Sequence, residues 1–246
     1  MKILKQFRAC FCVILLLINS AIQAQQTMDS GQQLGTKDKS IILISSLTAQ
    51  GKLTALKTAL NTGLDAGLTV NEIKEILVHT YAYCGFPRSI RGLQTFMEVQ
   101  DKRKEKNITD QTGVEASPVI SDNNKYERGK KNLGELTGVT QPDKLSGYSA
   151  FAPAIDTFLK EHLFADIFER DVLTYAQREL VTISVITAIG NADPMLQGHL
   201  NISLHVGWSA KQLKEFISVI SPTISKKKTK SAKTVLTLLL KSRQLK

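Results

Sequence analysis

The stretch that decides the fold is LTALKTALNTGLDAGLTVNEIKEIL, residues 53–77. It contains leucines at steps of three and four residues, the spacing of one apolar helix face: Leu53, Leu56, Leu60 and Leu64. Gly67 then suits the left-handed backbone conformation in which many helices end. Thr69 and Glu72 have the spacing of a capping box, which marks the start of a new helix. The stretch therefore predicts a helical hairpin.

The same pattern returns in DPMLQGHLNISLHVGWSAKQLKEFI, residues 193–217, at a shift of 140 residues that places Leu56 on Leu196. The turn chemistry is repeated as well, through Gly207, Ser209 and Gln212. Helical periodicity also precedes each copy, and no convincing period-two strand pattern is present. We therefore predict an all-α protein in which a longer helix followed by a helical hairpin is used twice.

Composition indicates an ordinary globular chain. Of its 246 residues 42% are hydrophobic and 22% charged, and the formal net charge is +10. Aromatic residues make up only 6%, so stacking platforms for single-stranded nucleic acid are not expected. Five lysines lie between Ser225 and Lys233; we interpret them as a solvated segment and predict no nucleic-acid partner.

The N-terminus has the order of a secretory signal peptide. A basic region with Lys2, Lys5 and Arg8 is followed by an apolar run at residues 9–18 and by small residues up to Ala24. The run is too short to span a bilayer comfortably. We expect cleavage near Ala24, a periplasmic or secreted protein and no stable membrane insertion; an uncleaved anchor is the alternative.

The pattern divides the chain into five predicted segments. They are a signal peptide (1–24), a first repeat (38–99), a linker (100–150), a second repeat (151–222) and a Lys-rich C-terminal segment (223–246). The linker is rich in Lys, Asp, Asn, Gly and Ser, with one short helix expected around residues 125–136. A segment of this length without strong periodicity is typically functional or a connector.

Cysteine and histidine usage limits the chemistry. Cleavage would remove Cys10 and Cys12 and leave Cys84 alone, which excludes an intrachain disulfide or a redox pair. His162 and His205 have no partners at metal-ligand spacing, and no glycine-rich phosphate loop is present. We therefore predict neither a metal nor another cofactor.

An ordered set of segments resembles the carboxymuconolactone decarboxylase family, which includes the alkylhydroperoxidase D-like proteins. The segments are EIL (75–77), YCGFP (83–87), FADIFER (164–170), RELVTI (178–183), GHL (198–200) and VG (206–207). The resemblance implies an all-α fold of alkylhydroperoxidase D-like repeats that assemble as trimers or hexamers. With two repeats per chain we expect a homo-oligomer, most simply a trimer, because a two-helix repeat cannot bury both of its faces alone.

The sequence also departs from the family. Where the peroxidase branch carries a Cys-x-x-Cys pair, this chain has Ala192 and Met195, and Ala59 stands in the first repeat where His199 stands in the second. Thiol peroxidase chemistry needs an attacking and a resolving thiol. The second repeat is therefore more similar to the decarboxylase branch, and the first repeat resembles a degenerate copy.

Two residues are the predicted catalytic pair. His199 lies on the buried stripe of its helix, and Glu179 lies on the preceding helix, where antiparallel pairing brings the two together. A histidine transfers protons near neutral pH; the alternative is a core histidine satisfied by a structural carboxylate. We predict substrate contacts from Arg178, which is suited to a carboxylate, and from His79 and Tyr83, which precede the Gly85 turn. A surface position or an interface ion pair for Arg178, and simple packing for the other two, remain open.

The predicted function is cofactor-free acid–base chemistry of the decarboxylase type on a small carboxylated lactone or carbonyl compound. A peroxidase-like antioxidant activity and a non-catalytic small-molecule-binding role are the alternatives. In every case the expected partners are a small molecule and further copies of the chain.

Overall fold

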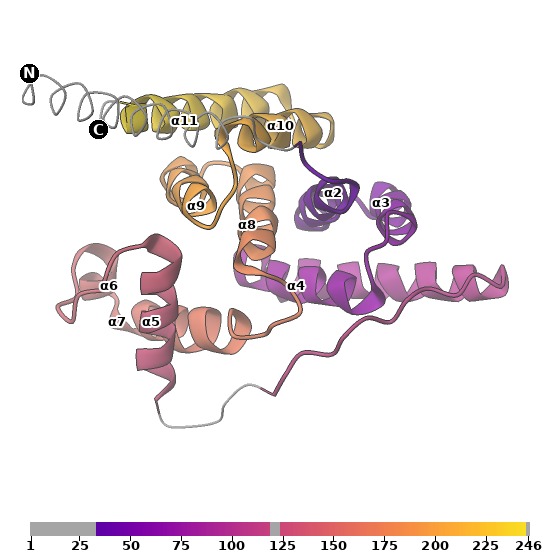
Figure 1. Cartoon of the computed structure of the whole chain (residues 1–246), viewed down its shortest axis with the longest axis horizontal. Coiled ribbons are helices and arrows are strands. Elements are labelled where there is room, and N and C mark those ends of the chain that lie inside the picture. The colour runs from indigo at the N-terminus through magenta and orange to yellow at the C-terminus, as the bar shows by residue number, and fades with distance from the viewer. Residues whose placement is uncertain (1–32, 119–123, 245–246) are drawn as a thin grey trace, which may run out of the picture.

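The structure is a computed structural model that describes residues 33–118 and 124–244. Within these ranges every regular element is a helix, so the all-α prediction is confirmed for this part of the chain. Figure 1 shows helices from both ends of the described chain packed around α8, with a separate group of helices beside them. The predicted signal peptide lies outside the described residues.

The first repeat consists of α2 (Thr36–Gln50), α3 (Leu53–Asp65) and the start of α4 (Val70–Glu105). Gly67 has a φ of 89°, which is the left-handed backbone predicted for it. The Thr69 hydroxyl then accepts a hydrogen bond from the backbone N–H of Glu72, and the Glu72 side chain bonds back to the Thr69 N–H. The predicted helix–turn–helix is therefore present.

The second repeat consists of α8 (Tyr175–Ile189), α9 (Asp193–His205) and α10 (Ala210–Ile220). Its turn copies that of the first repeat. Gly207 has a φ of 110°, and Ser209 and Gln212 form the same reciprocal cap at the start of α10. The two copies thus share their helix boundaries at the predicted shift, because the same residues end and start each helix.

An ion pair is repeated along with the helices. Glu75 on α4 accepts a hydrogen bond at 2.8 Å from Arg178, the fourth residue of α8. Glu215 on α10 makes an ion pair at 2.8 Å with Lys39, the fourth residue of α2. Each hairpin is therefore bonded to the long helix of the other repeat, so the repeats are interlocked and share one apolar core.

Helix α4 is broken at Gly85, whose φ of 81° and ψ of 159° are not helical. Pro87 follows, and a proline cannot continue the hydrogen bonding of the preceding turn. The break lies where the sequence predicts a tight turn. It separates a first half that carries Glu75, His79 and Tyr83 from a second half that runs on to Glu105.

The segment between the repeats contains ordered helices. After residue 123 it forms α5 (Lys125–Thr137) and α6 (Gly147–Phe151), which are followed by α7 (Pro153–Thr157) and the π-helix η1 (Phe158–Ile167). Helix α5 packs directly on η1, because Gly129 leaves room for the Lys160 carbonyl. Together with α9 they enclose a second, smaller apolar core (Leu136, Leu163, Phe164, Ile167, Phe168 and Ile202).

The Lys-rich stretch lies on a helix. After a short 3₁₀ turn, η2 (Ser221–Thr223), helix α11 spans Lys226–Gln244 and so includes the lysines that we interpreted as a solvated segment. Lysine is a good helix former, and the apolar side chains of α11 pack on α9 and α10. Among the residues described, no helix is both long and apolar enough to cross a membrane.

Candidate functional site

Helices α8 and α9 bring the predicted catalytic pair together. Nδ1 of His199 lies 2.9 Å from Oε2 of Glu179. The Glu179 side chain is fully buried, whereas 18% of the His199 side chain is exposed. A carboxylate accepts hydrogen bonds only, so the proton of this contact lies on Nδ1. In the neutral ring Nε2 is then the unprotonated nitrogen, which is free to accept a proton.

His199 lines a cavity of about 680 Å³, a volume in the usual range for small-molecule sites. Much of its wall is apolar and comes from α5, η1, α8 and α9: Leu133, Leu159, Leu163, Phe164, Ile186 and Ile202. The segment before α6 supplies part of the rim. The cavity therefore lies between α8 and α9 on one side and α5, η1 and the segment before α6 on the other, and it gives the His199 ring access to a ligand.

Tyr83 is the predicted substrate-contacting residue that also lines this cavity. Its ring lies between two histidines, with centroid distances of 5.4 Å to His79 and 5.8 Å to His199. Its hydroxyl is buried and lies near the side chains of Thr182 and Glu179. Burial and the nearby Glu179 raise the pKa of Tyr83, so the phenol stays protonated and can act as a donor.

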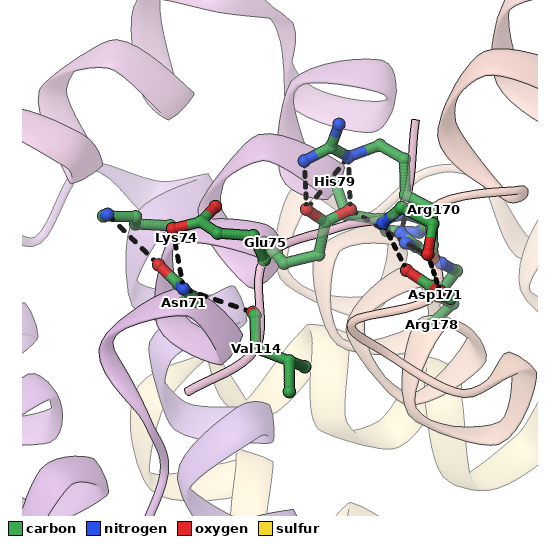
Figure 2. A network of polar contacts seen from close by, with 10 residues as sticks. Asn71, Lys74, Glu75, His79, Val114, Arg170, Asp171 and Arg178 are labelled. Carbon is green, nitrogen blue, oxygen red and sulfur yellow. Dashed lines mark hydrogen bonds and ion pairs between the residues drawn. The ribbon is translucent and has the colours of Figure 1, made fainter. Parts of the chain in front are cut away.

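Arg178 and His79 lie behind Tyr83 and do not line the cavity. Arg178 is fully buried and donates to Glu75 and to Nδ1 of His79, the latter at 3.1 Å. Arg170 binds the same Glu75 carboxylate through two of its nitrogens, at 2.9–3.0 Å (Figure 2). Of the alternatives left open by the sequence, the structure thus shows Arg178 in an ion pair that connects the two repeats.

The electrostatic state of His79 follows from these contacts. Burial, the Arg178 guanidinium and His199 hold the pKa of His79 well below its usual range. Because Arg178 can only donate, Nδ1 of the neutral ring accepts, and Nε2–H donates to the Thr182 hydroxyl at 3.0 Å. Tyr83 therefore packs on a neutral, fixed imidazole, which in turn holds Tyr83 against His199.

The lining of the cavity includes a polar group that the sequence analysis did not identify. Lys160 on η1 is almost fully buried, and its Nζ lies 2.7 Å from both Oδ2 of Asp156 and the hydroxyl of Tyr126. Lys160 and Asp156 both line the cavity, as does Lys144 near the rim. The spacing of Asp156 and Lys160, one helical turn apart, is a sequence signal for the pair. The sequence gives no signal that this pair is buried, because the helix that covers it, α5, lies in the predicted linker.

Cys84 lies beside this site and is partly buried. Its thiol donates to the Thr80 carbonyl at 3.1 Å, and burial raises its pKa to about 11. A thiol with this pKa carries little thiolate near neutral pH. No cluster of three or more His, Cys, Asp or Glu side chains suitable for a metal ion occurs in the part of the chain that the structure describes.

Comparison with known proteins supports the resemblance noted from the sequence. A model of the carboxymuconolactone decarboxylase family matches residues 22–96 and 153–237, two segments consistent with a tandem arrangement. The chain is also similar to an uncharacterized protein of Methanocaldococcus jannaschii, at 27% identity over 75 residues, which is 30% of this chain and 70% of that protein. The matched segments include every residue of the cavity wall named above on η1, α8 and α9.

Proposed function

Because the chain belongs to the carboxymuconolactone decarboxylase family, we propose that it catalyses a cofactor-free proton transfer, of the decarboxylase type, on a small carboxylated lactone or carbonyl compound. The observation that carries this proposal is the contact between His199 and Glu179 at the wall of a cavity of ligand size. The two residues come from different helices and meet where a bound molecule can reach the ring.

The chemistry follows from the residue types. When a carboxylate leaves as carbon dioxide from a carbon next to a carbonyl group, the electron pair of the broken bond passes to the carbonyl oxygen. The carbon must then be protonated. His199 in its imidazolium form supplies that proton from Nε2, and Glu179 stabilises the cation and holds the ring through Nδ1.

Tyr83 has a distinct role in this scheme. A charge that develops on the carbonyl oxygen needs a hydrogen-bond donor fixed in place before the reaction. The Tyr83 ring lines the cavity, but its hydroxyl is buried near Thr182 and Glu179, so the ring shapes the cavity beside His199 and does not supply that donor. His79 packs on Tyr83, and Arg178 binds His79 from behind. Both residues act by fixing the Tyr83 ring, so we propose that they are positioning residues.

The peroxidase alternative has less support. Ala192 and Met195, which occupy the positions of the family's cysteine pair, both line the cavity and supply no thiol. The raised pKa of Cys84 also disfavours a thiolate. A non-catalytic binding role uses the same cavity, and an activity test distinguishes it from the enzyme.

The test is a survey of small β-keto acids and unsaturated lactone acids in D₂O, in which NMR follows carbon dioxide release and deuterium uptake at carbon. We expect turnover by the wild-type protein and a loss of about 10²–10⁴-fold in His199→Gln. His205→Gln is the matched control, because His205 lies on the same helix, bonds the Glu135 carbonyl and does not line the cavity.

Melting temperatures of both variants show whether the fold is retained. Turnover in His199→Gln at the wild-type rate would exclude His199 as the proton-transfer residue. Absence of turnover across the whole survey would favour the binding role.

A further inference from the structure

The charged side chains that line the cavity are distributed unevenly. His199 lies at one wall, whereas Lys144, Asp156 and Lys160 lie among the lining residues from α7, η1 and the segment before α6. Apolar side chains from α5, α8 and η1 make up much of the remaining lining. Such a cavity suits a molecule with an apolar body and a charged head group.

The sign of the head group's charge follows from the charges of the side chains that line the cavity. Two lysines and one aspartate line the cavity, so with His199 neutral their net formal charge is +1. Asp156 is compensated, because hydrogen bonds from Lys160, Tyr126 and Ser149 outweigh the effect of burial and keep its pKa low. Lys144 forms no ion pair with any described residue. The excess charge that a ligand meets is therefore positive.

Lys160 also retains bonding capacity. An ammonium group has three N–H donors, and the described contacts of Lys160 use two acceptors, Asp156 and Tyr126. Burial works against its charge, but the bonds to Asp156 and Tyr126 outweigh that effect and raise the pKa of Lys160. A charged, nearly buried donor is thus part of the cavity wall, and its described hydrogen bonds account for two of its three N–H groups. Arg178 offers no such group, because it is fully buried and does not line the cavity.

We propose that Lys144 and Lys160 bind a carboxylate of a small organic anion, distinct from any carboxylate that is released at His199, and that the apolar body of the anion lies along the cavity toward His199. The inference rests on the proposed function in that it identifies the groups that would hold the substrate at the His199 site. A charge-assisted hydrogen bond in a largely apolar cavity distinguishes a carboxylate from a neutral head group of similar size.

The experiment uses two probes that share an apolar body, octanoate and 1-octanol, in calorimetric titrations of the purified protein at pH 7. We expect the wild-type protein to bind octanoate about tenfold or more tightly than octanol, as is typical of a hydrogen bond to a charged group. Equal affinities for the two probes, or no binding of either, would overturn the proposal.

Two variants locate the head group. Lys144→Gln changes an exposed side chain and is not expected to affect folding. The double variant Lys160→Met with Asp156→Asn removes both charges together, because removing Lys160 alone would leave a buried, unpaired carboxylate. We expect each variant to weaken octanoate binding severalfold or more and to leave octanol binding unchanged. Retention of the full preference for octanoate in both variants would contradict the assignment.

Two controls separate this inference from the proposed chemistry. Lys131→Gln changes an exposed lysine of α5 that does not line the cavity, and it should leave both affinities unchanged. His199→Gln should keep the preference for octanoate while it abolishes proton transfer. If no compound of the survey is turned over but the lysine variants lose octanoate, the anion site stands and the proposed chemistry fails.

Discussion

Arg178 donates a hydrogen bond to Nδ1 of His79 at 3.1 Å, in the buried layer between the two repeats. A guanidinium has no acceptor, so this contact alone decides which nitrogen of the neutral ring carries the proton. The proton lies on Nε2, which faces the Thr182 hydroxyl, and that hydroxyl donates in turn to the Arg178 carbonyl. A pair of residues 99 positions apart in sequence thus fixes both the tautomer and the orientation of a ring that packs on Tyr83.

The first prediction concerns pH and stability. The folded protein holds the pKa of His79 well below 6.5, whereas the unfolded chain has the ordinary value of about 6.5. Below that pH the unfolded state takes up a proton that the folded state does not, so stability is complete above pH 6.5 and falls as the pH decreases. Urea unfolding between pH 8 and 5 measures this loss, which is at most about 1.4 kcal/mol per pH unit for one group.

The variant for this test is His79→Asn, whose side-chain oxygen still offers Arg178 an acceptor. Its stability should depend less steeply on pH than that of the wild type in the same range. His162→Asn is the control for the substitution itself, because 52% of the His162 side chain is exposed. An unchanged slope in His79→Asn would show that the acid sensitivity has another origin.

A second prediction follows from the contact between Glu179 and His199. In nitrogen-15 NMR spectra, the neutral His199 ring should carry its proton on Nδ1, because the buried carboxylate accepts there. Glu179→Gln replaces that acceptor by an amide of the same shape, so the tautomer should become mixed and turnover should fall. His205 provides an internal reference, and its signals should not move. A neutral ring protonated on Nε2 in the wild-type protein would contradict the proposed positioning of the His199 ring by Glu179.

A third prediction concerns the reactivity of Cys84. A pKa of about 11, compared with an ordinary value of 9.0, lowers the thiolate fraction about 100-fold near neutral pH. Alkylation of Cys84 by iodoacetamide at pH 8, followed by peptide mass spectrometry, should therefore be far slower in the native protein than in urea. Cys84→Ser should leave any turnover unchanged. Rapid native alkylation, together with a hydroperoxide activity lost in Cys84→Ser, would favour the peroxidase alternative.

A fourth prediction uses two glycines of α5. A Cβ at Gly129 would lie 1.7 Å from the backbone oxygen of Lys160, whereas at Gly134 the nearest atom is 3.5 Å away. Gly129→Ala must therefore displace α5 from η1, with an expected loss of about 1–3 kcal/mol and weaker octanoate binding. Gly134→Ala should stabilise the helix by up to about 1 kcal/mol. Urea unfolding of both variants tests the packing, and equal effects would contradict it.

The local elements of the fold could be predicted from the sequence. The leucine stripes, Gly67 and Gly207, and the caps at Thr69 and Ser209 all act over three to five residues, so a single segment contains the whole signal. The shift between the repeats follows from the same signals. The approach of His199 to Glu179 was also predictable, because consecutive helices of a repeat pack against one another.

The polar interior was decided by the tertiary structure. Nothing in the sequence indicates that Arg178 is buried. Its buried charge is compensated by Glu75, 103 residues away, whose carboxylate accepts a hydrogen bond from the guanidinium. The helix at residues 125–136 could be predicted from sequence as a short element, but its packing on η1, which encloses Lys160 and completes the cavity, could not. Periodicity and caps are local and remain readable in one segment, whereas the free energy of a buried charge depends on partners that only the folded chain brings together.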